Sequence, residues 1–126
     1  MNVKIDTKEK FTVITPEETV ISANMTATLS NLLLQYLQKD IPHLVFNMQK
    51  VTQADENACE TLAQIQQQFY EKNCSFVICN LPAAVEKILS DKEWLETMNI
   101  TPSESEAWDI VQMEEIEREL LNGEWD

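Results

Sequence analysis

Three cysteines and one histidine are the side chains of this sequence best able to act as nucleophile, base or metal ligand. The cysteines are Cys59, Cys74 and Cys79, which form no C-x-x-C pair, and the histidine is His43. A nucleophile needs a base within hydrogen-bond reach, and a structural zinc ion needs four Cys or His ligands at paired spacings. Cysteines in a reducing compartment are mostly buried, and His43 opens an apolar segment where a structural position is favoured. We therefore expect no catalytic residue, no metal site and no cofactor.

The acidic residues and the glycine content also argue against an enzyme. Glu17 and Glu18 are adjacent, as are Glu114 and Glu115, and neighbours on a regular element point apart and cannot share a proton. The only glycine, Gly123, follows the last predicted helix in the usual C-terminal stop position. A Gly-rich phosphate-binding loop is therefore absent from the sequence.

Length and charge limit the class of protein. The 126 residues, 44% of them hydrophobic, can bury a sizeable core, and we expect one domain over residues 1–126. The sequence has no run of eighteen apolar residues and its start does not resemble a signal peptide, which predicts a cytoplasmic protein. The net charge of −13, from 9 basic and 22 acidic residues, repels phosphate backbones and anionic membranes, so neither nucleic acid nor membrane is an expected partner. The acidic stretch 114–126 is typical of a helix face exposed to solvent. Alternatively, its charge steers the protein toward a basic partner.

Short apolar segments predict the strands. Segments rich in β-branched residues, or apolar without alternation, are VKID, FTVIT, HLVFNM, SFVICN and, more weakly, MNI. The absence of alternation in residues 43–48 and 75–80 is typical of strands covered on both faces of a partly parallel sheet.

Apolar residues at helical spacing predict four helices. The first stripe is Met25, Leu29, Leu32, Leu33, Tyr36 and Leu37, and the second is Ala58, Leu62, Ile65 and Phe69, with Gln64, Gln66, Gln67 and Gln68 toward solvent. The third helix has Pro82 in its first turn and the apolar residues Val85, Ile88 and Leu89. The fourth opens with Ser103 and Glu106 as a capping box and continues with Ile110, Met113, Ile116 and Leu120 on one side. Right-handed crossovers fold this order into an α/β domain, a small mixed sheet of four to five strands flanked by about four helices.

The stretch VTQADENACETL, residues 51–62, joins a predicted strand to the second helix through three polar residues. The start of a helix exposes unpaired N–H groups and the positive end of the dipole, which favour an acidic cap or a bound anion. Asp55 can cap this helix, or Asn57 can cap it with Glu60 as the reciprocal partner. Such caps contribute about 0.3–2 kcal/mol, which is enough to explain the residues structurally.

The order of elements resembles the STAS domain family, which includes the bacterial anti-sigma factor antagonists. The resemblance rests on the strand HLVFNM, the turn KVTQADENA with the helix after it, the strand SFVICN followed by PAAVEKIL, and the closing helix SESEAWDIV. Phosphorylated members resemble Asp-Ser-Ser-Gly-Leu at the turn, and the second serine is modified by a kinase that is also an anti-sigma factor. Here those places read Asp55-Glu56-Asn57-Ala58-Cys59, so the acceptor serine is replaced by Asn57.

The resemblance implies a non-catalytic regulatory module that binds a protein partner, an anti-sigma factor with a kinase-like fold. The expected partner-binding or switch residues are Asp55, Glu56, Asn57, Ala58, Glu60 and Thr61. Because Asn57 is neutral, it favours the state of the unmodified, binding-competent family member. Thr52 and Thr61 are alternative phosphate acceptors. The alternative function is sensing of a small molecule or nucleotide, which is known for some members of the family.

Overall fold

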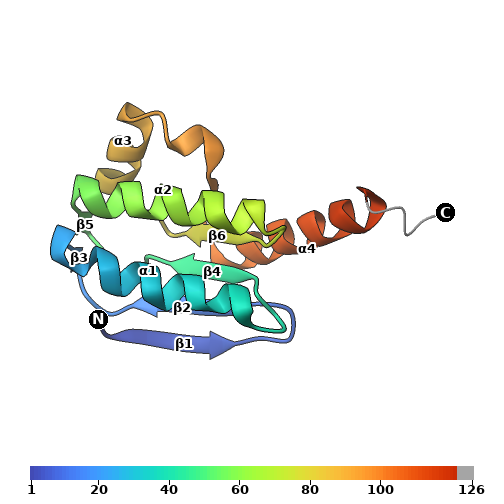
Figure 1. The fold of residues 1–126 in the computed structure, drawn as a ribbon. Helices are drawn as coiled ribbons and strands as arrows, with labels where there is room; N and C mark the ends of the chain where they lie inside the picture. Colours follow the sequence, from blue (N-terminus) through green and yellow to red (C-terminus); the bar gives the residue numbers. More distant parts are fainter. Residues whose placement is uncertain (122–126) are drawn as a thin grey trace.

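A computed structural model gives the fold and describes residues 1–121. Its centre is a five-stranded sheet in the order β1-β2-β4-β6-β7, in which β1 is antiparallel to β2 and the other neighbours are parallel (Figure 1). The strands are β1 (Val3–Thr7), β2 (Thr12–Pro16), β4 (Leu44–Asn47), β6 (Phe76–Cys79) and β7 (Asn99–Thr101). The predicted early strands, the two apolar strands and the weak last strand are all confirmed.

The described residues also contain four α-helices, which completes the predicted α/β fold. They are α1 (Thr26–Leu34), α2 (Glu56–Glu71), α3 (Ala83–Asp91) and α4 (Glu104–Leu121), with the 3-10 turns η1 (Ala23–Met25), η2 (Gln35–Gln38) and η3 (Leu95–Thr97). The first three helices cover one face of the sheet and α4 covers the other (Figure 1). None of the helices in this part of the chain is both long and apolar enough to cross a membrane.

Successive side chains along the strands point alternately into two hydrophobic cores, one on each face of the sheet. Phe46 and Phe76 face the three-helix side, where Phe76 lies 5.2 Å from Phe69 of α2 between ring centroids. Val45 and Val77 face α4 and are completely buried. Every residue of β4 and β6 is buried, because these two strands are covered on both faces, as their lack of polar alternation predicted.

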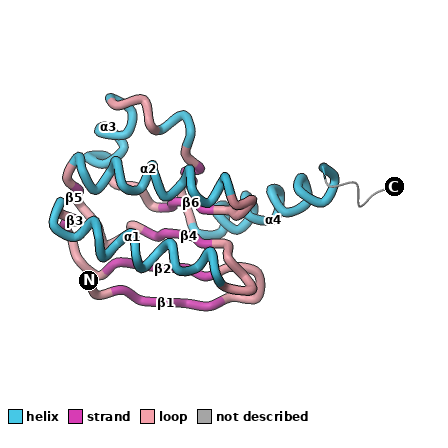
Figure 2. Tube along the Cα trace, in the orientation of Figure 1, coloured by secondary structure: helices cyan, strands magenta, loops and turns pink. Residues whose placement is uncertain are grey.

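A second sheet of two short strands was not predicted. β3 (Val20–Ile21) pairs in parallel with β5 (Gln53–Ala54), and the two lie side by side at one end of the molecule (Figure 2). The backbone N–H groups of Thr52 and Gln53 also donate to the carbonyl of Thr19. This pairing brings the chain that precedes α1 next to the chain that precedes α2.

The prediction that Gln66 lies on the solvent side of α2 is wrong. Its side chain is only 6% exposed, and its Oε1 accepts the backbone N–H of Asn99 at 3.2 Å. A buried amide that is satisfied in this way costs little, so the glutamine spacing alone could not separate it from its exposed neighbours.

The predicted apolar stripe of α4 is only partly the side that packs on the sheet: Ile110 lies against the core on this face. The completely buried residues are Ala107 and Val111, whereas Met113 and Ile116 are 55% and 57% exposed. The second half of α4 extends past the ends of the strands (Figure 1), where Ile116 is not covered by the sheet. At the other end Ser103 accepts the N–H of Glu106 at 3.3 Å, as a capping box requires. The predicted stop at Gly123 lies outside the described residues.

Candidate functional site

The head of α2 follows β5 directly, at the end of the molecule where the β3–β5 pair lies (Figure 1). Asp55 has extended backbone angles, φ −68° and ψ 158°, and occupies the N-cap position. Glu56 is the first residue of the helix and Asn57 the second, and both side chains are exposed. Asn57 therefore presents its side chain to solvent on the first turn of a helix.

Asp55 does not cap its own helix. Its Oδ2 accepts the backbone N–H of Ala23, at the start of η1, at 2.8 Å, and its own N–H donates to the carbonyl of Ile21 at 2.9 Å. The alternative capping box of Asn57 and Glu60 does not form either, because the helix already begins at Glu56. The side chain of Asp55 instead ties the start of η1 to the start of α2.

The other polar side chains at the head of α2 are partly engaged. Glu56 forms an ion pair with Lys92, just after α3, at 3.2 Å, and both side chains are largely exposed, so the pair contributes little stability. The hydroxyl of Thr61 donates to the backbone carbonyl of Asn57 at 2.9 Å, and that of Thr52 to the carbonyl of Thr19 at 3.1 Å. The carboxylate of Glu60 is exposed.

Ala58 and Cys59 are completely buried and anchor the first turn of α2 in the core. Ala58 belongs to the predicted partner-binding set, but a side chain with no exposed surface cannot contact a partner. It allows the helix to approach its neighbours closely. The accessible part of the predicted set is therefore Asp55, Glu56, Asn57, Glu60 and the half-buried Thr61.

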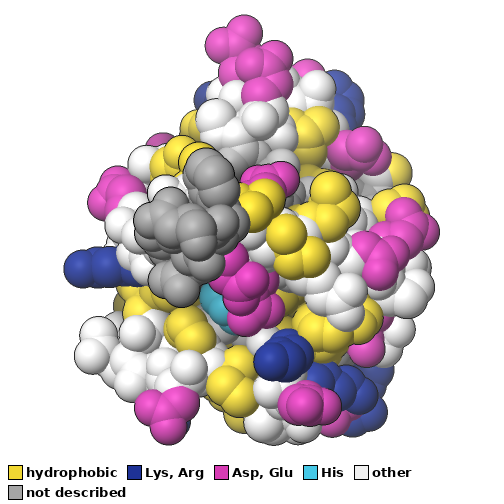
Figure 3. Space-filling view, turned by 90° about the vertical axis from the view of Figure 1, so that its right-hand side faces the viewer, with side chains coloured by type: hydrophobic (Ala, Val, Ile, Leu, Met, Phe, Trp, Pro, Cys, Tyr) yellow, Lys and Arg dark blue, Asp and Glu magenta, His cyan; other side chains and the backbone are white. Residues whose placement is uncertain are grey.

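The head of α2 is unfavourable for anions and for thiolate chemistry. Burial, with the nearby charges of Asp55 and Glu56, raises the pKa of Cys59 to about 11. The same acidic side chains occupy the positive end of the helix dipole, where a phosphate would otherwise bind. Acidic side chains are not confined to this place, since they are also spread over the opposite end of the molecule (Figure 3).

The remaining candidates for chemistry are structural. Burial raises the pKa of Cys79 to about 12. His43 accepts the backbone N–H of Ser75 on Nδ1 at 3.1 Å, and burial together with the charge of Arg118 lowers its pKa. Among residues 1–121 no three Cys, His, Asp or Glu side chains gather as metal ligands.

Comparison with known proteins supplies the family. The STAS domain model matches residues 2–107. A putative anti-sigma factor antagonist from Thermotoga maritima has a TM-score of 0.79 at 14% identity, over 87% of this chain and 94% of that chain. A serine-to-glutamate variant of RsbS from Moorella thermoacetica gives 0.72 at 20% identity, over 89% and 96%. The unphosphorylated anti-sigma factor antagonist SpoIIAA gives 0.69 at 12% identity, over 88% and 96%. No curated protein sequence matches the chain.

Proposed function

The chain belongs to the STAS domain family and resembles the anti-sigma factor antagonists in structure, and from this premise we propose that it is a regulatory module without catalytic activity. In this proposal residues 1–126 act as one unit and bind another protein through the head of α2. The observation that carries it is the exposed amide of Asn57 on the first turn of that helix. The partner is an anti-sigma factor with a kinase-like fold.

The head of α2 suits protein recognition because its backbone is held in place. Ala58 and Cys59 fix the first turn from inside, and Asp55 is bonded to Ala23 from outside. A surface that is ordered before binding loses less conformational freedom when the partner docks. The partner would contact Glu56, Asn57 and Glu60, whose negative charge favours a basic surface and raises the association rate.

Asn57 fixes the regulatory state in this proposal. An amide cannot accept a phosphoryl group, and it adds no charge where a phosphate would add about −1.5 to −2. The protein would therefore remain in the binding-competent state. Thr52 and Thr61 are weaker acceptor candidates, because both hydroxyls already donate to backbone carbonyls, that of Thr52 to Thr19 and that of Thr61 to Asn57.

The thiols and the imidazole support the absence of catalysis. Cys59 and Cys79 are buried with pKa values of about 11 and 12, so both are protonated near neutral pH. A protonated thiol is a poor nucleophile. His43 uses Nδ1 to accept a backbone N–H, which leaves it in a structural role.

The alternative at this site, nucleotide sensing, is disfavoured by charge. A nucleotide phosphate at the helix start would lie beside Asp55 and Glu56, and the neighbouring cation Lys92 is already paired with Glu56. A thermal-shift measurement with ATP and GTP tests this directly. A rise in melting temperature that saturates with either nucleotide would favour the alternative.

The partner proposal is tested by affinity capture from the native cell lysate followed by mass spectrometry. Asn57→Arg should abolish capture of the partner, because a bulky cation on the first turn blocks the surface. Gln68→Arg is the matched control, since it makes the same change on the same helix at another exposed position, about 16 Å further along. Capture that is equal for both variants, or absent with the native protein, would contradict the proposal.

The locked state is tested separately by restoring a hydroxyl. Asn57→Ser, produced in the native cell, should acquire a phosphoryl group on the new serine, detected by peptide mass spectrometry. The native protein should carry none at that position, and Asn57→Ala serves as the control for loss of the amide. A phosphoryl group on Thr52 or Thr61 of the native protein would show that the switch has moved instead of being lost.

A further inference from the structure

A hollow of about 890 Å³ opens beside α3, at the carboxyl ends of β4, β6 and β7. Twelve residues line it, from the stretches 48–51, 80–86 and 95–102. Small-molecule sites in open α/β sheets lie outside the carboxyl ends of the strands, and their usual volume is roughly 300–1,000 Å³. No residue of the head of α2 lines it, so it is distinct from the proposed partner surface.

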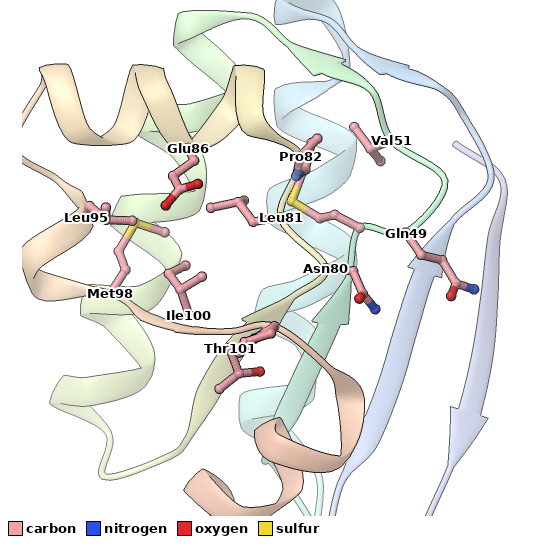
Figure 4. Close-up of a pocket in the computed structure, with 12 residues that line it drawn as sticks. Gln49, Val51, Asn80, Leu81, Pro82, Glu86, Leu95, Met98, Ile100 and Thr101 are labelled. Atoms are coloured by element: carbon pink, nitrogen blue, oxygen red, sulfur yellow. The ribbon is translucent and has the colours of Figure 1, made fainter.

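One end of the hollow is apolar. Leu81, Leu95, Met98 and Ile100 gather around one space in Figure 4, whereas Asn80 and Gln49 lie at its other end. Eight of the twelve lining residues are apolar, and they come from three separate segments of chain. Removing an apolar ligand from water against such side chains is favourable by about 25 cal/mol per Å² of buried area. A matching ligand therefore has an apolar body.

Glu86 supplies the only charge of the lining. It lies in the first turn of α3, and its carboxylate is turned toward the space beside Leu81 (Figure 4). Within residues 1–121 it forms no ion pair, and no lysine or arginine lines the hollow. An anionic ligand would meet this carboxylate and the overall charge of −13 without compensation, whereas a cation is complementary to both.

Hydrogen bonds hold the polar end of the hollow in shape. Asn80 adopts a left-handed conformation with φ 57°, which turns the chain after β6, and its Nδ2 donates to Oδ1 of Asn47 at 2.9 Å. The same Oδ1 accepts the N–H of Gln49 at 3.0 Å. The hydroxyl of Thr101 donates to the carbonyl of Ser103 at 2.8 Å. Because these groups satisfy one another, the loops are fixed before any ligand arrives.

We propose that this hollow binds a small organic cation, a molecule with an apolar body and one amine or guanidinium group that pairs with Glu86. The apolar body lies against Leu81 and Ile100, and the cationic group lies at the carboxylate. This site does not depend on the proposed partner surface, and either proposal can fail without the other.

The test uses three probes of equal shape and different charge, which are 3-phenylpropylamine, 3-phenylpropan-1-ol and 3-phenylpropionate. Each is titrated into the ¹⁵N-labelled full chain, and amide chemical shifts are followed by NMR. The amine should cause saturable shifts at the amides of Leu81, Met98 and Ile100. The alcohol should bind there about threefold to tenfold more weakly, as expected for one partly exposed ion pair, and the carboxylate weaker still.

Glu86→Gln should reduce the affinity of the amine to that of the alcohol and leave the alcohol unchanged. Glu86 is exposed, so this substitution leaves the fold intact. Glu119→Gln on α4 changes the net charge by the same amount away from the hollow and should alter neither affinity. The proposal is overturned if no probe gives saturable shifts at the lining amides, if amine and carboxylate bind equally, or if both variants weaken the amine alike. If the hollow binds none of the three probes and Glu86→Gln abolishes binding of a protein partner, the hollow is a protein interface, and the proposal is overturned.

Discussion

Removing the carboxylate of Asp55 should destabilise the protein more than removing any other exposed acid at the head of α2. Its Oδ2 accepts the N–H of Ala23 at 2.8 Å, and hydrogen bonds to a charged group contribute about 1.5–3 kcal/mol. Because Asp55 is exposed, water replaces part of this bond, and about 1–2 kcal/mol is the reasonable share. A further 0.3–1 kcal/mol, roughly, comes from its negative charge at the helix start.

Asp55→Ala should therefore lower the free energy of unfolding by about 1.5–2.5 kcal/mol, measured by urea denaturation with circular dichroism. At about 3–5 °C per kcal/mol for a chain of this size, the melting temperature should fall by roughly 5–10 °C. Asp55→Asn keeps an acceptor oxygen without the charge and should lose about half as much.

Glu56→Ala is the matched control, because it removes an acid from the adjacent position together with an exposed ion pair to Lys92. Its cost should be about 0.5–1 kcal/mol. The reasoning is refuted if Asp55→Ala costs no more than Glu56→Ala, because the bond to Ala23 would then contribute nothing to stability.

Three further predictions concern the core and its edges. Iodoacetamide at pH 8 should label Cys74 alone in the folded protein and all three cysteines in urea. The reason is that pKa values of about 11 and 12 leave Cys59 and Cys79 with a thiolate fraction of roughly one in a thousand or less. Labelling of Cys59 at the rate of Cys74, measured by mass spectrometry, would contradict this prediction. The pKa of His43, the single histidine, should lie below 6.5 when measured by NMR, because burial favours the neutral form. The contribution of neutral His43 to the free energy of unfolding is complete above pH 6.5 and declines as the pH falls toward the lower folded-state pKa. His43→Gln should remove this decline. Trp108→Ala should lower the free energy of unfolding by about 2–3 kcal/mol, because its ring stacks on Phe11 at 4.9 Å and joins α4 to the sheet. Tyr70→Ala removes a ring that is 73% exposed and should change the free energy of unfolding by no more than about 0.5 kcal/mol.

The parts of the fold that could be predicted from the sequence are set by local pattern. The segments around Phe46 and Phe76 show no polar alternation because both faces of these strands are covered. The stripe of α2 from Ala58 to Phe69 repeats at helical spacing because one side of that helix faces the core. In both cases the burial that decides the structure is visible within a few neighbouring residues.

The parts that could not be predicted depend on contacts between distant segments. Asp55 was expected to accept an N–H of its own helix, but its carboxylate instead accepts the N–H of Ala23, 32 residues earlier. Gln66 is buried because it meets the N–H of Asn99, 33 residues later. No local signal marks either pair.

On α4 the predicted apolar stripe consists of large residues, of which Met113 and Ile116 are exposed. The completely buried residues are the smaller Ala107 and Val111, which lie outside that stripe. A pattern of large apolar residues therefore did not identify the side of the helix that packs most closely on the sheet.

The pairing of β3 with β5 has a consequence for motion. Only two residues on each side form this ladder, and the register joins Ile21 to Ala54, so the pairing closes a long loop through α1 and β4. Closing a loop of that length costs roughly 3 kcal/mol of chain entropy. A ladder this short can therefore separate while the five-stranded sheet stays folded, and exchange of the amides of Gln53 and Asp55, which donate to Thr19 and Ile21, would then run ahead of exchange in β4 and β6. A binding protein that requires the closed arrangement would slow that exchange, which makes the ladder a reporter of occupancy.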